Sequence, residues 1–156
     1  MNVFAPTMSR AMSDAALQVE RAANQGRREL QEKSMMLGLG SAVFEELAAV
    51  AEECGRGDWD GHDAMPVTKD AYDNAFRFLE ALPLGTPAPS VGAEPDGDLT
   101  LEWHRTGRRT LSVSISPEGD VHYSALFGPG TTYGTEPFFG DVPAAILDLI
   151  RRVDAQ

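Results

Sequence analysis

Residues 99–127 read LTLEWHRTGRRTLSVSISPEGDVHYSALF, and this stretch decides the fold. Apolar and polar side chains alternate through three runs, which two short turn sequences, RTGR and PEGD, separate. Alternation with a period of two is the pattern of strands that have one buried and one solvated face. The stretch therefore predicts a three-stranded antiparallel meander. Residues 131–139 allow a short fourth strand, so we expect three to four strands.

Outside the meander, apolar residues recur at three- and four-residue spacing, which is typical of helices. This spacing predicts helices from Ser41 as N-cap to about Glu53, from the cap Thr68 to Pro83, and from near Asp141 onward. The segment 84–98 is rich in Pro, Gly and Asp and is predicted to be a surface linker. The expected fold class is α+β, with N-terminal helices, then the meander, then a C-terminal helix, and with the helices on one face of the sheet.

The N-terminal third differs from the rest of the chain. A run from Ser9 or Ser13 to about Met36 is rich in helix formers but has only a thin apolar stripe, so this helix needs a partner. We therefore expect residues 1–36 to be a tail and helical arm, and residues 37–156 to be a single compact α+β domain. A homodimer formed through residues 9–36 is one prediction that follows.

Composition narrows the classes of function. The chain has 156 residues and a net charge of −11, and residues 34–156 hold 8 Lys/Arg against 20 Asp/Glu. Such a domain repels phosphates, which argues against direct nucleic-acid binding and favours a protein partner with a basic surface. No run approaches the ~20 apolar residues of a membrane span. The single Cys54, which follows two glutamates, indicates an unreactive thiol with a raised pKa and a cytoplasmic location.

An acidic loop at residues 55–67 is the first candidate site. Its spacing of carboxylates before a glycine is similar to the opening of a calcium loop, but the glycine comes two positions early and the closing Glu is absent. An Asp/Gly turn with capping carboxylates explains the pattern better, and Trp59 is expected to hold the loop against the sheet or a helix. As an interaction surface, the loop offers Asp58, Trp59, Asp60, His62 and Asp63.

The polar face of the sheet is the second candidate site, and its residues are Glu102, His104, Ser112, Ser114, His122 and Ser124. The expected register places His104 opposite Thr110 and His122 opposite Ser114. That offset of about four residues, or ~13 Å, is too long for the two imidazoles to share one metal ion. We therefore predict no metal, no cofactor and no catalytic residues.

The loop and meander together resemble a known group of sequences. The resemblance rests on Trp59-Asp60-Gly61 with Ala64 and Pro66, on the following helix, on Pro95-Asp96-Gly97 and on Leu101-Glu102-Trp103. The chain is similar over about residues 55–152 to a set of small uncharacterised bacterial proteins. The resemblance implies a compact bacterial domain and brings no activity, cofactor or catalytic residue with it.

Three functions remain open from the sequence. The favoured one is a non-enzymatic, acidic protein-interaction module that acts as an inhibitor, antitoxin or immunity-type partner of a basic macromolecule. The second is a small-ligand or enzymatic site on the polar sheet face. The third is a self-assembling structural protein that associates through its N-terminal helix.

Overall fold

The computed structural model describes residue 18, residues 21–22 and 24–29, and residues 39–156. The chain forms two units, Met1–Lys33 and Ser34–Gln156. In the first unit every described residue is helical, within the segment where the sequence predicts a helix. The ends of that predicted helix lie outside the described residues. None of the described helices has both the length and the apolar character needed to cross a bilayer.

The second unit contains a five-stranded antiparallel sheet in the order β1-β2-β3-β4-β5, so each strand pairs with its neighbour in sequence. The strands are β1 (Ser90–Ala93), β2 (Leu99–Thr106), β3 (Arg109–Ile115), β4 (Asp120–Phe127) and β5 (Gly130–Pro137). The α+β class and the antiparallel meander are confirmed. The predicted number of three to four strands is wrong, because the sheet has five.

Strand β1 is the element that the sequence prediction missed. Ser90–Ala93 lies inside the predicted linker and pairs with residues 99–102 of β2. Helix α2 (Ser41–Glu53) also holds this strand, because the Val91 amide donates to Glu46 Oε1 over 3.0 Å. The strand has four residues with a glycine and no clear alternation. Its stability therefore comes from its neighbours rather than from its own sequence.

Three helices belong to this unit: α2 (Ser41–Glu53), α3 (Lys69–Glu80) and α4 (Ala144–Asp154). Thr68 caps α3 as predicted, since its side chain accepts a hydrogen bond from the Ala71 amide. The predicted cap of α2 is wrong by one residue: Gly40 holds the N-cap position with a φ of 75°, and Ser41 is already helical. Helix α4 begins at Ala144, three residues after the predicted start, with Pro143 as N-cap.

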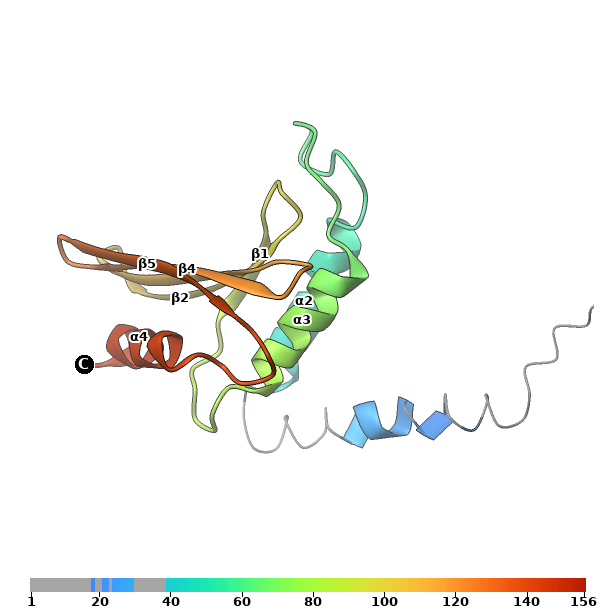
Figure 1. The fold of residues 1–156 in the computed structure, drawn as a ribbon, viewed down its shortest axis with the longest axis horizontal. Coiled ribbons are helices and arrows are strands. Elements are labelled where there is room, and N and C mark those ends of the chain that lie inside the picture. The colour runs from blue at the N-terminus through green and yellow to red at the C-terminus, as the bar shows by residue number, and fades with distance from the viewer. Residues whose placement is uncertain (1–17, 19–20, 23, 30–38) are drawn as a thin grey trace, which may run out of the picture. The chain divides into compact units, whose positions relative to one another are not determined.

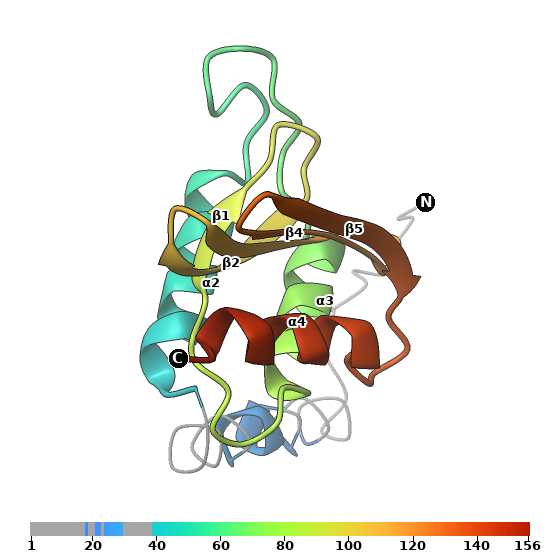
Figure 2. The ribbon, with the colours of Figure 1, turned by 90° about the vertical axis from the view of Figure 1, so that its left-hand side faces the viewer.

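The core lies between the helices and one face of the sheet. Figure 1 shows α4 along that face, and Figure 2, turned by 90°, shows α2 and α3 on the same side of the strands. Eight of the alternating apolar side chains of the meander point into this core and are fully or almost fully buried: Leu99, Leu101, Trp103, Leu111, Val113, Ile115, Val121 and Ala125. The opposite face carries the polar side chains of the same strands.

Two arginine contacts, at the end of the sheet where β3 starts and β4 finishes, hold the C-terminal helix α4 in place. Arg109, at the start of β3, donates to the carbonyl of Ala155. The Arg152 guanidinium lies 4.1 Å from the centre of the Phe127 ring, in a cation–π contact. These arginines are therefore engaged in packing the helix against the sheet.

Candidate functional site

The acidic loop, residues 55–66, is closed at its base by backbone hydrogen bonding. The Val67 amide donates to the Cys54 carbonyl over 2.9 Å, and the Asp58 amide donates to the Ala64 carbonyl over 2.8 Å. Asp58 Oδ1 also accepts a hydrogen bond from the Asp63 amide over 2.9 Å. The loop is thus an ordered structure in which carboxylates accept the hydrogen bonds of backbone amides that no helix or strand satisfies.

Asp60 stabilises the tip of this loop. Its Oδ1 accepts from the His62 amide over 2.8 Å and from the Ala64 amide over 3.2 Å. These hydrogen bonds, the first being the stronger influence, lower the pKa of Asp60. The structure therefore has the predicted Asp/Gly turn, in which the side chains of Asp58 and Asp60 cap the loop's own amides.

Trp59 has a structural role in the loop. Its ring is half-buried and packs against the hydrophobic core, while its Nε1 donates to the carbonyl of Met65 over 2.9 Å. His62 and Asp63 remain exposed. Asp58 is exposed as well, whereas Trp59 and Asp60 are partly buried.

The loop lies against the turn between β1 and β2, residues 94–98. The Met65 amide donates to the Pro95 carbonyl over 2.8 Å. A Cβ atom on Gly97 would lie 3.0 Å from the Pro66 carbonyl oxygen, so the two backbones approach as closely as only glycine permits. Figure 2 shows the loop and the turn projecting together from the same end of the sheet.

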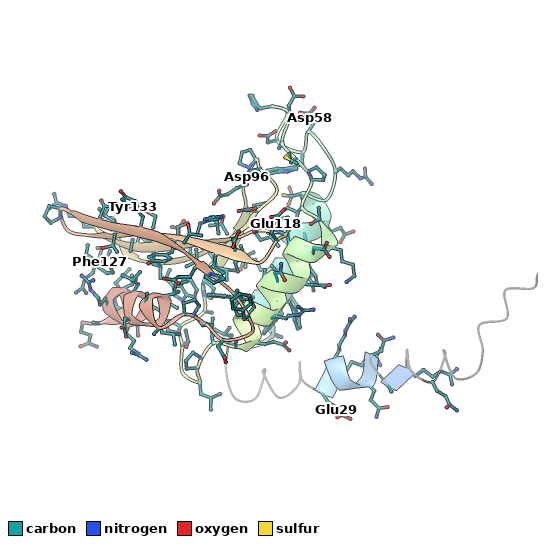
Figure 3. The ribbon with its side chains drawn as sticks, viewed as in Figure 1. Glu29, Asp58, Asp96, Glu118, Phe127 and Tyr133 are labelled. Atoms are coloured by element: carbon teal, nitrogen blue, oxygen red, sulfur yellow. The ribbon has the colours of Figure 1, made fainter. Side chains whose placement is uncertain are left out.

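Carboxylates gather at this end, which we call the acidic end. It consists of the loop 55–66, the turn 94–98 and the β3–β4 turn 116–120, and Figure 3 marks one residue of each: Asp58, Asp96 and Glu118. These segments hold eight Asp/Glu and one basic residue, Arg56. The ion pairs formed by the described residues lie elsewhere, at Lys69–Asp73, Arg105–Asp154 and Arg151–Asp148. The negative charge of the acidic end is therefore not neutralised within the described part of the chain.

The polar face of the sheet forms rows across the strands. The register confirms the predicted pairs of His104 with Thr110 and of His122 with Ser114. One row contains Glu102, Ser112, Ser124 and Tyr133, and the row nearer the acidic end contains Thr100, Ser114, His122 and Thr135. His104 lies two rows from His122, so the six predicted face residues share a surface without converging on one point.

In the row nearest the acidic end, hydrogen bonds link two pairs of neighbours. Glu94 Oε1 accepts from the Thr100 hydroxyl over 2.7 Å and also from the Ser114 hydroxyl. His122 Nδ1 lies 2.9 Å from the hydroxyl oxygen of Thr135. The predicted face residue Ser114 thus contacts a glutamate that the sequence prediction did not include, and His122 contacts Thr135.

Asp98 lies two residues before Thr100, in the turn 94–98, and is the most unusual carboxylate of the site. It is only 8% exposed, and its carboxylate accepts no hydrogen bond and forms no ion pair with any described residue. Burial, together with the charges of Asp96 and Glu94, raises its pKa to about 6. Asp98 is therefore a buried acid that lacks a partner.

Sequence reasoning missed Glu94 and Asp98 because both lie in the predicted linker. The only available signal was the period of two: Asp98 precedes Leu99 and so continues the polar positions 100, 102 and 104 of β2. Glu94 contacts Thr100 and Ser114 from the turn that follows β1, so these contacts can be seen only once β1 is paired.

In comparisons with known proteins, no family model, curated protein or solved structure matches the chain. The resemblance to small bacterial proteins thus stays a prediction. Within residues 39–156 and the described part of the N-terminal unit, no group of three or more His, Cys, Asp or Glu side chains is arranged to hold a metal ion. The segment predicted to self-associate, residues 9–36, lies mostly outside the described residues.

Proposed function

We propose that this protein is a non-enzymatic binding module that presents its acidic end to a basic protein surface, as a cytoplasmic inhibitor, antitoxin or immunity-type partner does. The observation that carries the proposal is the gathering of eight carboxylates against one arginine in three adjoining segments, none of them ion-paired within the described chain. These carboxylates repel one another, and a complementary basic surface relieves that repulsion, which makes binding favourable.

The shape of the acidic end supports the same proposal. The loop 55–66 is fixed by its own hydrogen bonds and by Trp59, so its exposed carboxylates lose little conformational freedom on binding. The arginines at the other end of the sheet, Arg109 and Arg152, are engaged with Ala155 and Phe127. The two ends of this unit thus differ in charge, which would orient a basic partner during approach.

The test compares two variants with the same change in net charge. The first neutralises the acidic end with Asp63→Asn, Asp96→Asn, Glu118→Gln and Asp120→Asn. The second neutralises four acidic residues elsewhere, with Glu45→Gln, Asp70→Asn, Glu80→Gln and Asp141→Asn. Affinity for a fluorescent decalysine peptide is measured by anisotropy between about 50 and 500 mM NaCl, a range in which the Debye length falls well below the size of the domain.

We expect the acidic-end variant to bind at least about tenfold more weakly than wild type at about 150 mM NaCl, with the second variant close to wild type. The tagged full-length chain should also capture a basic protein from its host, and the acidic-end variant should lose that protein. Equal losses in both variants, or binding that does not respond to salt, would contradict the proposal.

A further inference from the structure

Asp98 is a buried carboxylate that has no partner within the described chain. It is more than nine-tenths buried, yet its carboxylate has no hydrogen-bond donor among the described residues. No described side-chain oxygen is both sealed from solvent and without a partner, so the oxygens of Asp98 keep contact with solvent. This contact with solvent is the route by which a ligand would reach the carboxylate.

The groups around Asp98 make a positive ligand the favourable one. Glu94 lies beside Asp98, since its amide donates to the Asp98 carbonyl over 2.9 Å. The charges of Asp96 in the same turn, of Glu118 in the β3–β4 turn and of His122 on β4 also act on Asp98, and His122 is the one base among them. Three of these four neighbours are acids, so they disfavour the ionised form of Asp98 in the free protein. A cation placed beside Asp98 would interact favourably with all of these carboxylates at once.

Glu94 supplies a second, oriented carboxylate. The Thr100 and Ser114 hydroxyls both donate to its Oε1, which fixes the group over the polar face and leaves Oε2 available. Glu94 is also tied to Asp98 through the backbone, because its amide donates to the Asp98 carbonyl over 2.9 Å, so the two acids lie next to each other. A carboxylate already held by two donors needs little rearrangement to bind a ligand.

We propose that Asp98 and Glu94 form a receptor for one primary ammonium group, supplied by a lysine side chain of the basic partner. An ammonium is compact, carries three N–H donors and sits on a narrow aliphatic stem, which suits a carboxylate of low accessibility. A guanidinium is a wider, planar fork. A metal ion lacks the third ligand here, since no described group of three suitable side chains could hold one. This inference rests on the proposed function, because it names the group that the partner contributes.

The first test uses n-butylammonium as the probe, on the full-length protein. The ionisation of Asp98 is followed by carboxyl ¹³C NMR as a function of pH, with and without the probe. We expect a saturable response and a fall of about one unit in the pKa of Asp98, because a bound cation stabilises the carboxylate. Tetramethylammonium, which has the same charge but no N–H donor, should give a much smaller shift. Equal responses to the two ions would overturn the proposal.

The second test uses Asp98→Asn, which keeps the shape of the side chain, with Asp96→Asn as the matched control. Asp98→Asn should weaken binding of the decalysine peptide at least about tenfold, and should weaken binding of a decaarginine peptide less. Asp96→Asn removes the same charge from the same turn and should have the smaller effect on both peptides. Backbone amide spectra of the two variants verify that each is folded.

These experiments separate the receptor from the proposed function. If Asp98→Asn binds decalysine as wild type does while neutralising the acidic end abolishes binding, the proposed function stands and the receptor is refuted. If butylammonium binds at Asp98 while no basic peptide or protein binds, the receptor is supported and its ligand is a free amine, which spermidine in place of the peptide would identify.

Discussion

At the scale of single residues, Asp98 makes stability depend on pH. Its pKa is about 6 in the folded state and near 3.8 without the fold, so the folded protein holds this proton more tightly than the unfolded chain does. The contribution of this group to the free energy of unfolding therefore falls as pH rises from about 4 to about 7.

We predict that Asp98→Asn stabilises the protein at pH 8 by about 1–2 kcal/mol and has little effect at pH 4. The buried carboxyl group of Asp98 is ionised at pH 8 and protonated at pH 4, so the substitution removes a buried charge only at the higher pH. Urea unfolding of both proteins at the two pH values measures this. Glu45→Gln, at an exposed acid on α2, serves as the control. A variant that is less stable than wild type at pH 8 would show that an unrecognised partner satisfies Asp98.

At the scale of elements, the strongly patterned segments were predictable and the weakly patterned ones were not. The alternation in residues 99–127 fixes β2, β3 and β4 and their register, because a shift of one residue would expose a whole apolar face. Strand β1 has no such pattern and forms because β2 and Glu46 satisfy its backbone. The site was predictable to the same extent: its face residues on β2–β4 were found, whereas Glu94 and Asp98, beside β1, were not.

Gly134 of β5 allows Tyr123 of β4 to pack across the strand pair. The two residues are register partners, and a Cβ atom on Gly134 would lie 2.5 Å from the Tyr123 hydroxyl oxygen. We predict that Gly134→Ala lowers the free energy of unfolding by about 1–3 kcal/mol, since the tyrosine must move. Thr131→Ala, on the exposed face of the same strand, should change it much less. Thermal or urea unfolding compares the two, and equal losses would contradict the packing role.

At the scale of the whole folded unit, residues 34–156, negative charge is concentrated where the three acidic segments meet. Repulsion within the acidic end opposes folding and is reduced by salt, because the Debye length shortens from about 30 Å at 0.01 M to about 8 Å at 0.15 M.

The melting temperature should therefore rise by roughly 3–5 °C between 0.01 and 0.3 M NaCl, equivalent to about 1 kcal/mol for a domain of this size. Differential scanning calorimetry at a fixed pH of 7.5 measures the change. In the variant with a neutralised acidic end, most of this rise should disappear, and in the variant neutralised elsewhere it should persist. A melting temperature that is independent of salt would mean that the carboxylates are too well solvated to repel one another.

The closed base of the acidic loop also provides a built-in kinetic probe. Cys54, the only cysteine of the chain, is 7% exposed, and its carbonyl holds the Val67 amide that closes the loop. Burial, and then the neighbouring Glu53, raises the pKa of its thiol, so little thiolate forms while the loop is shut. The rate at which an alkylating reagent modifies the unaltered protein thus reports how often this base opens, and protection of the thiol would reveal an occupant of the acidic end without any introduced label.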